Sequence, residues 1–136
     1  GNMVATMNVE DKDTSSYGII TPGKIIRDKI EVRDIVEKPN PKNAPSNIAV
    51  VGRYIIQPSV FEDLALQKKG TNDEIQLTDS LSSQIGKAPF YAYNFIGTRY
   101  DCGTKIGFTK ANTNFAIKDD EIGKEYNDWL SSLLKN

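Results

Sequence analysis

Two short segments carry the side chains best suited to chemistry. Glu37 and Lys38 are adjacent, before a proline at the end of an apolar run. A carboxylate accepts hydrogen bonds from vicinal sugar hydroxyls, and an ammonium offers a compact positive charge to a phosphate. Asp101 lies between an aromatic run and a segment with helical signals, and Mg²⁺ prefers one or two carboxylates plus phosphate oxygens and water. Taken alone, a solvated ion pair and a helix-capping aspartate explain these residues more simply.

Two further segments have both a structural and a functional explanation. Gly18 follows a tyrosine, and its missing side chain would let a ligand approach the backbone closely, although a tight turn explains it equally well. In the polar segment 73–79, Thr78 or Asp79 is suited to cap the helix that follows. We assign this segment to architecture first and to ligand binding second.

The composition excludes several classes of function. The chain has no histidine, which removes the serine and cysteine triads. Seventeen basic and eighteen acidic residues give a formal charge of −1, which predicts neither a nucleic-acid nor a membrane partner. Cys102 is the only cysteine, so an internal disulfide is excluded and a reducing, cytoplasmic setting is favoured. The chain lacks an apolar run of ~18 residues and the features of a signal peptide.

Hydrophobic periodicity predicts strands mixed with helices, which is an α/β class. Strands are expected over residues 3–9, 30–36, 47–56 and 89–96, and a turn is expected at 21–23. Helices are expected to begin near Pro58, Leu77, Thr104 and Ile122, with Gly70 just past the end of the first and Gly86 as the stop of the second.

The same patterns predict which faces are buried. In the first strand, alternate apolar residues form one half-buried face, namely Met3, Ala5, Met7 and Val9. This strand begins almost at residue 1, so we expect an exposed apolar edge and a chain cut from a longer one. The continuous run 47–56 favours a strand covered on both faces. The helix after Thr104 is expected to bury a stripe formed by Phe108, Ala111, Asn112, Phe115 and Ala116.

The residue types of the motifs and their order along the chain are together more specific than any single motif. Together they resemble the bacterial UTP-glucose-1-phosphate uridylyltransferase family, from about residue 3 to the last helix. The residues that carry the resemblance are Tyr17-Gly18-Ile19-Ile20, Val36-Glu37-Lys38-Pro39, the run 44–54 with Val51-Gly52-Arg53-Tyr54, the segment 73–79, and Tyr100-Asp101-Cys102-Gly103.

The resemblance implies an enzyme that joins UTP and glucose 1-phosphate to form UDP-glucose and pyrophosphate, with Mg²⁺ as cofactor. It implies that Gly18 contacts the hexose, that Glu37 holds sugar hydroxyls and that Lys38 holds the sugar phosphate. It further implies that Val51 and Gly52 line the sugar pocket.

The remaining role that the resemblance implies concerns the metal. Asp101 would ligate Mg²⁺, so Lys38 and Asp101 would be the two catalytic residues. No Gly-x-Gly occurs in this sequence, whereas the family binds the nucleotide with a Gly-rich loop in its N-terminal half. We therefore expect residues 1–136 to be a single C-terminal fragment with the sugar-phosphate side of the site.

The expected fold is the C-terminal portion of a nucleotide-diphospho-sugar transferase, a Rossmann-like α/β fold with a mixed sheet, without the N-terminal nucleotide-binding half. We expect the fragment alone to be inactive and to form a homo-oligomer, with the 3–9 edge and the helix carrying Trp129 as contact surfaces. Two alternatives stay open. One is a related dTDP-, ADP- or CDP-sugar pyrophosphorylase, and the other is a non-catalytic sugar-phosphate-binding or oligomerisation module.

Overall fold

A computed structural model describes residues 1–66 and 75–134 of the chain. The fold divides into two compact units, residues 1–96 and residues 97–136, and each is described by itself. Gly70, predicted to follow the end of a helix, lies outside the described residues. Within the described ranges, no helix is long and apolar enough to cross a membrane.

The first unit is built on a five-stranded sheet that closes on itself in the order β1-β4-β2-β3-β5. β1 and β5 are parallel, and the other neighbouring strands are antiparallel. The predicted mixed sheet is therefore confirmed. The strands are β1 (Asn2–Asn8), β2 (Gly18–Ile26), β3 (Lys29–Glu37), β4 (Ile48–Ile55) and β5 (Phe90–Asn94).

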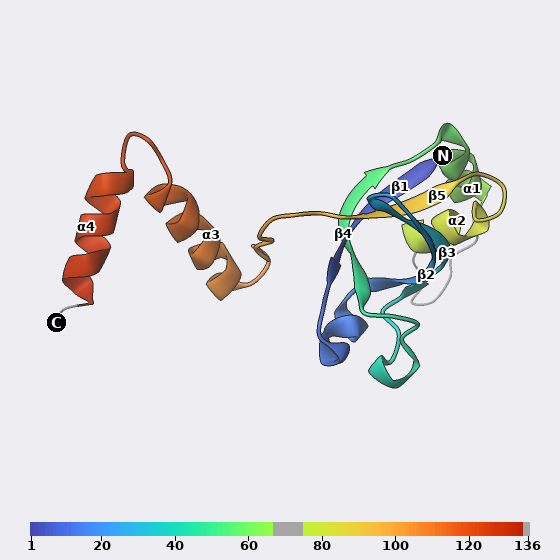
Figure 1. Ribbon diagram of the computed structural model, residues 1–136, viewed down its shortest axis with the longest axis horizontal. Helices are drawn as coiled ribbons and strands as arrows, with labels where there is room; N and C mark the ends of the chain where they lie inside the picture. The colour runs from blue at the N-terminus through green and yellow to red at the C-terminus, as the bar shows by residue number, and fades with distance from the viewer. Residues whose placement is uncertain (67–74, 135–136) are drawn as a thin grey trace. The chain divides into compact units, whose positions relative to one another are not determined.

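Helical segments connect these strands. Two short 3₁₀ helices, η1 (Asp11–Ser16) and η2 (Pro41–Asn43), contact each other, and two α-helices, α1 (Pro58–Leu66) and α2 (Leu77–Ser83), lie between β4 and β5 in the chain. α1 and α2 lie side by side, and α2 packs against β3 (Figure 1). Gly86 has a φ of 85° in the turn after α2, a left-handed conformation that favours glycine.

The core lies inside the closed sheet and beneath the two helices. It consists of aliphatic residues from all five strands and both helices together with one phenylalanine. Burial of this apolar surface is the main term that favours the fold. The members are Val4, Ile20, Val32, Ile35, Val50, Val60, Leu81, Phe90 and Ala92.

Two predictions about β1 are wrong. Val4 and Thr6 are fully buried, whereas the predicted inner residues Met3 and Met7 are only partly buried. β1 pairs with β4 on one side and β5 on the other, so the predicted free edge does not exist. Alternation alone could not identify the inner face, because apolar residues occur on both faces of β1, Val4 on the buried one and Met3, Ala5 and Met7 on the other.

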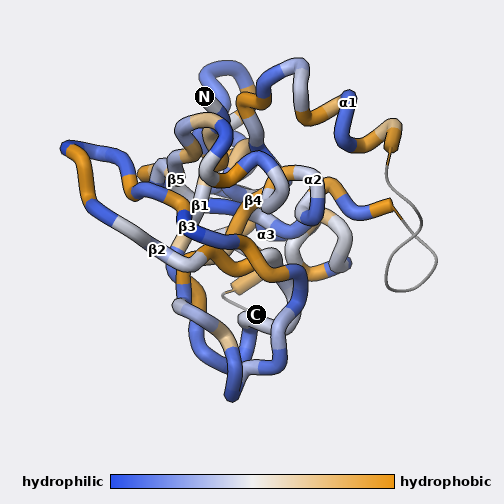
Figure 2. The backbone as a smooth tube through the Cα atoms, turned by 90° about the vertical axis from the view of Figure 1, so that its right-hand side faces the viewer, coloured by the Kyte–Doolittle hydropathy of each residue, from blue (hydrophilic) through white to orange (hydrophobic). Residues whose placement is uncertain are grey.

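The predicted turn at residues 21–23 is also wrong. β2 continues to Ile26, and the chain reverses at Arg27, which has a φ of 58°. Pro22 lies at irregularities in the β2–β3 register, where a proline without an N–H is tolerated because the ladder is already interrupted. Figure 2 shows hydrophobic colouring at the tip of the projecting hairpin, where Ile25 and Ile26 are exposed.

β4 is only partly covered. Ala49 and Val50 are buried, but the strand is exposed from Gly52 to Ile55. The expectation of a strand covered on both faces therefore fails for its second half. Gly52 has a φ of 71° where the β1–β4 register shifts, so the backbone itself requires a glycine there.

The second unit contains α3 (Lys105–Ile117) and α4 (Gly123–Leu133), which pack against each other. Thr104 caps α3 as predicted, because its Oγ1 accepts a hydrogen bond of 3.1 Å from the N–H of Gly107. The predicted buried stripe of α3 is only partly correct. Ala111 is buried, whereas Phe108 and Phe115 are 57% and 68% exposed.

Candidate functional site

The candidate site begins where β2 starts and β3 ends. Gly18 and Glu37 are register partners in the antiparallel pair, which places the first two predicted site residues side by side. The N–H of Lys38 donates a hydrogen bond of 3.0 Å to the carbonyl oxygen of Tyr17, which extends the pairing by one step. The strand at 30–36 was predicted but β2 was not, so the pairing that brings Gly18 beside Glu37 could not be read from the sequence patterns.

The Glu37 carboxylate is fixed by a residue far away in the sequence. Thr78 Oγ1, in the first turn of α2, donates a hydrogen bond of 2.7 Å to Glu37 Oε2. Thr78 is buried, and the Glu37 side chain is 32% exposed. A hydrogen bond to an ionised acceptor is stronger than one between neutral groups, so α2 holds the carboxylate in one orientation.

This bond corrects the prediction that Thr78 caps α2. The N-cap residue is Gln76, whose side chain makes no capping hydrogen bond. Thr78 serves the Glu37 carboxylate instead, and local sequence reasoning missed this role. The only feature of the sequence that pointed to this role was the polar character of the segment 73–79. Residues 73 and 74 of that segment lie outside the described ranges.

Gly18 leaves room for the carboxylate. A Cβ atom at this position would lie 3.1 Å from Glu37 Oε2 and 3.9 Å from both Ile35 Cδ1 and Val50 Cβ. The first distance is closer than ordinary van der Waals contact, so a larger residue would push the carboxylate by a few tenths of an ångström. A glycine here lets the Glu37 carboxylate stay where Thr78 holds it.

The ammonium of Lys38 lies beside Glu37 but does not form a strong ion pair with it. Lys38 Nζ lies 3.9 Å from Glu37 Oε1, and the lysine side chain is 64% exposed. An exposed pair at this separation contributes little stability, so the ammonium remains available to an anion. Lys38 has a φ of 46°, a left-handed conformation that is uncommon for a residue with a Cβ and is often found at functional sites.

Val51 and Gly52 lie on β4. Val51 is partly buried and Gly52 is exposed, with no atom within 4 Å of a hypothetical Cβ. Their role in lining a sugar pocket stays a prediction. Tyr54 belongs to a motif named from the sequence but was given no role there. It is linked to the site, since burial first and the charge of Glu37 second raise the pKa of its phenol.

Asp101 belongs to the second unit, so its proximity to Glu37 and Lys38 stays a prediction. Its Oδ1 accepts a hydrogen bond of 3.1 Å from the N–H of Gly103, and its carbonyl oxygen accepts one from Thr104. The cap of α3 is Thr104, so the alternative that Asp101 caps this helix is wrong. Its exposed carboxylate suits Mg²⁺ as one of several oxygen ligands.

The described residues provide groups that can bind a ligand but not a complete metal site. They contain no group of three or more acidic or cysteine side chains that could hold a metal ion, so Asp101 would need ligands from a substrate or from other residues. Glu37 can accept hydroxyl groups, and Lys38 can bind a phosphate. This arrangement favours binding of a phosphorylated polyol over acid–base catalysis.

Comparison with known proteins identifies the family to which this chain belongs. A Staphylococcus epidermidis protein named UTP–glucose-1-phosphate uridylyltransferase is 39% identical over 97% of this chain and 46% of its own length. A crystal structure of UDP-glucose pyrophosphorylase complexed with UDP-glucose is 42% identical, with a TM-score of 0.79 over 87% of this chain and 45% of that chain. The UTP-bound enzyme from Acinetobacter baumannii is 30% identical, with a TM-score of 0.83 over 98% and 46%.

These matches also show how much of each relative the chain covers. It spans about half the length of the curated relatives it matches. Residues 1–117 match the family described as Nucleotidyl transferase, which covers the closed sheet and α3. This chain therefore belongs to the nucleotidyl transferase family.

Proposed function

We propose that this chain provides the sugar-phosphate side of an enzyme that transfers a uridylyl group from UTP to glucose 1-phosphate, forming UDP-glucose and pyrophosphate. The observation that carries the proposal is the Glu37 carboxylate, held by Thr78 at 2.7 Å beside the space left by Gly18, with the Lys38 ammonium next to it. Relatives named for this activity support the choice of substrates.

Each residue has a defined task in the proposed reaction. Glu37 accepts hydrogen bonds from hexose hydroxyls, and Lys38 offsets the charge of the sugar phosphate as it approaches the triphosphate. A phosphate oxygen of glucose 1-phosphate attacks the α-phosphorus of UTP in line, and pyrophosphate leaves. No general base is needed because the attacking phosphate is already ionised, which suits a chain without histidine.

Asp101 is our proposed ligand for Mg²⁺. The ion would neutralise charge on the transferred phosphoryl group. Oδ1 of Asp101 already accepts the N–H of Gly103, which orients the carboxylate before a metal arrives. Val51 and Gly52 are proposed to line the sugar pocket on the β4 side.

The nucleotide is the least constrained part of the proposal. A putative glucose-1-phosphate thymidylyltransferase from Bacillus anthracis matches this chain at 25% identity with a TM-score of 0.65. A thymidylyl transfer is therefore the second candidate function. Higher identity to the uridylyltransferases favours UTP.

We further propose a cytoplasmic location and a homo-oligomer. The single exposed cysteine, Cys102, suits a reducing compartment. Within the second unit, Ile122 at the N-cap of α4 and Trp129 and Leu133 on the helix are about half exposed, and apolar residues of this kind are frequent at subunit contacts. Analytical ultracentrifugation of the chain tests the assembly, and a single monomer species at high concentration would contradict it.

Calorimetric titration with glucose 1-phosphate tests the site. Glu37→Gln is expected to weaken binding by roughly tenfold because a neutral amide is a poorer acceptor for sugar hydroxyls, and Lys38→Ala is expected to weaken it similarly through the phosphate. Lys42→Ala, an exposed lysine on η2, is the matched control and should bind like the unmodified chain. Equal affinity in all four proteins would remove Glu37 and Lys38 from the site.

A further inference from the structure

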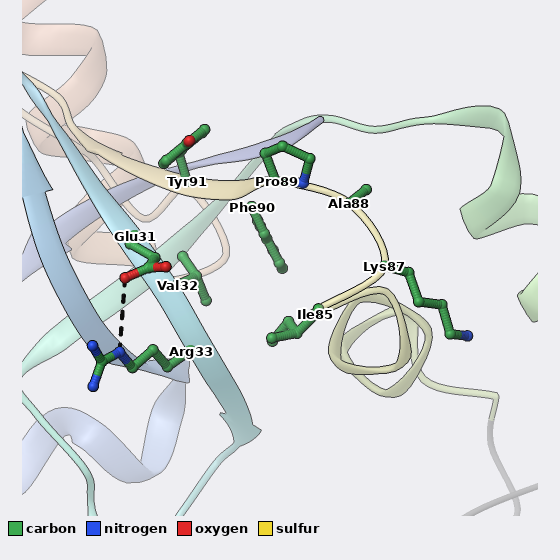
Figure 3. A pocket seen from close by; sticks show the side chains of 10 residues that line it. Glu31, Val32, Arg33, Ile85, Lys87, Ala88, Pro89, Phe90 and Tyr91 are labelled. Atoms are coloured by element: carbon green, nitrogen blue, oxygen red, sulfur yellow. Dashed lines mark ion pairs between the residues drawn. The ribbon is translucent and has the colours of Figure 1, made fainter.

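A break in the alternation of β3 decides which face of the strand carries Glu37. Val32 and Ile35 are both buried, at 3% and 6% exposure, although residues three apart in a regular strand lie on opposite faces. In Figure 3 Val32 points toward Phe90, another core residue. Glu37 lies two residues after Ile35 and therefore shares its face, where Thr78 reaches it. Unbroken alternation from Val32 would turn both Ile35 and Glu37 outward.

The cause of the break is a β-bulge immediately before Asp34. Two successive residues of β2 pair with Asp34 and Val32, so Arg33 between them has no partner on that strand. In Figure 3 the Arg33 side chain extends away from Val32. One unpaired residue inverts the alternation of the strand that follows it, and bulges often re-aim a side chain in this way beside a functional site.

The Asp34 carboxylate supports the backbone at the bulge. Its Oδ1 accepts a hydrogen bond of 2.8 Å from the N–H of Ile35, the first residue after the bulge whose side chain enters the core. Aspartate is short enough to make local bonds of this kind to the backbone. The bond therefore favours the bulged conformation over a regular strand.

The same oxygen of Asp34 also holds α2. Ser82 Oγ donates a hydrogen bond of 3.0 Å to Asp34 Oδ1. Thr78, whose hydroxyl donates to Glu37, lies four residues earlier and hence on the same face of the helix. Two carboxylates of β3 are therefore each bound by one hydroxyl of α2. A single bond would leave the helix free to turn about it, whereas two bonds fix its position along the strand.

We infer that Asp34 is a positioning residue for the Glu37 carboxylate. Through its bond to Ile35 it maintains the bulge that brings Glu37 to the inner face. Through Ser82 it keeps Thr78 within hydrogen-bonding distance of Glu37. The effect on ligand binding rests on the proposed function, whereas the effect on Thr78 can be measured without a ligand.

The ligand-free test measures the side-chain rotamer of Thr78. Three-bond couplings from its methyl carbon to the backbone nitrogen and carbonyl carbon report χ1 in the isotope-labelled chain. A single rotamer is expected in the unmodified chain, because Oγ1 is bound to Glu37. Ser82→Ala leaves the bulge intact and should give averaged couplings. Ser82→Thr keeps the hydroxyl and should retain the single rotamer.

Calorimetry with glucose 1-phosphate measures the effect on binding. Ser82→Ala is expected to weaken affinity about threefold and Asp34→Ala about tenfold, because the second variant loses both hydrogen bonds. Asp34→Asn keeps an acceptor oxygen and should lie between Asp34→Ala and the unmodified chain. Asp28→Ala removes an exposed aspartate from the turn between β2 and β3. It is the matched control and should bind like the unmodified chain.

A double-mutant cycle shows whether the contact with α2 acts through Thr78. If Ser82 acts by placing Thr78, then Ser82→Ala should have little further effect on affinity in a chain that already carries Thr78→Val. Fully additive losses would show that the effect of Ser82 does not pass through the threonine.

The two readouts separate this inference from the proposed function. If the unmodified chain does not bind glucose 1-phosphate, the proposed function fails, and the Thr78 couplings alone decide the inference. The dispersion of the amide spectrum reports whether each variant is folded, and Ser82→Ala decides if Asp34→Ala does not fold. Unchanged Thr78 couplings in Ser82→Ala, additive losses in the cycle, or full affinity in a folded Asp34→Ala would overturn the inference.

Discussion

At the scale of single residues, the proposed binding depends on how the Glu37 carboxylate is held. Glu37 has its backbone fixed by pairing with Gly18, one oxygen fixed by Thr78, and the other near Lys38. A binding group held in advance loses less conformational freedom when a ligand arrives. This explains why a glycine, a threonine and a lysine from three segments are needed around one glutamate.

Thr78→Val tests this arrangement because valine has nearly the shape of threonine but no hydroxyl. We expect a loss of roughly 1 kcal/mol in the free energy of unfolding, since the hydrogen bond to Glu37 is removed. Affinity for glucose 1-phosphate should also fall. Thr78→Ser retains the donor and should keep most of the affinity, so equal binding by the valine and serine variants would contradict the role of this bond.

Tyr54 provides a prediction about pH. Its pKa is raised above the ordinary value of 10.0, first by burial and then by Glu37. A raised pKa means that the folded state disfavours the phenolate. The associated stability is complete below the ordinary value and is lost as the pH rises through the folded-state pKa. Tyr54→Phe should therefore reduce the loss of stability at alkaline pH.

Absorbance titration of tyrosine ionisation, with the Tyr54→Phe spectrum subtracted, measures this pKa directly. Glu37→Gln should lower it only part of the way toward the ordinary value, because burial is the larger cause. An unchanged pKa of Tyr54 in Glu37→Gln would show that the glutamate does not act on the phenol.

At the scale of elements, hydrogen bonds to one acidic side chain connect α1 to the end of α2. The Asp63 carboxylate on α1 accepts hydrogen bonds from Ser83 and from Gln84, at the end of α2. Gln84 in turn accepts one of 2.9 Å from Ser59. Because α2 also carries Thr78, this connection helps to set the position of the helix that holds Glu37.

The Asp63 connection predicts acid sensitivity. Hydrogen bonds from Ser83, then from Gln84, and the nearby Lys87 lower the pKa of Asp63 below its ordinary value of 3.8. A lowered pKa contributes stability above the ordinary value, and that stability is lost as the pH falls through the folded-state pKa. Asp63→Asn should therefore unfold more easily near neutral pH and show a smaller further loss in acid.

Urea unfolding at neutral and acidic pH measures this difference. Glu62→Gln, an acidic residue on the same helix, is the control and should retain the acid sensitivity of the unmodified chain. If Asp63→Asn lost as much stability in acid as that control, the connection between α1 and α2 would not depend on this carboxylate.

The elements also show what the sequence could and could not predict. Glu37 and Lys38 were placed correctly at the end of a strand, because an apolar β-branched run followed by proline is a local signal. The bond from Thr78 to Glu37 spans 41 residues, so no local pattern could reveal it. The inner face of β1 was predicted wrongly because closure of the sheet, rather than alternation, decides which side faces the core.

At the scale of the whole molecule, this chain spans about half the length of its curated relatives and divides into two units. The sugar-binding candidates lie in residues 1–96, and the metal-binding candidate Asp101 lies in residues 97–136. The sequence has no Gly-x-Gly for a triphosphate. A chain with candidates for sugar-phosphate binding but without this nucleotide motif predicts binding of the sugar phosphate without transfer.

We therefore expect no measurable uridylyl transfer by this chain alone. Pyrophosphate release from UTP, glucose 1-phosphate and Mg²⁺ is the assay, with a full-length relative such as the Staphylococcus epidermidis protein as the positive control. Turnover comparable to that control would contradict the expectation that residues 1–136 lack the nucleotide site.

The most direct test of the central claim is to map where glucose 1-phosphate binds on the isotope-labelled chain by amide chemical shifts. We predict saturable shifts that are largest at Gly18, Glu37, Lys38 and Thr78 and that need about tenfold more glucose 1-phosphate to reach half-saturation in Lys38→Ala. Saturation that leaves these four amides unmoved, or an unchanged half-saturation concentration in Lys38→Ala, would contradict the role given to this site.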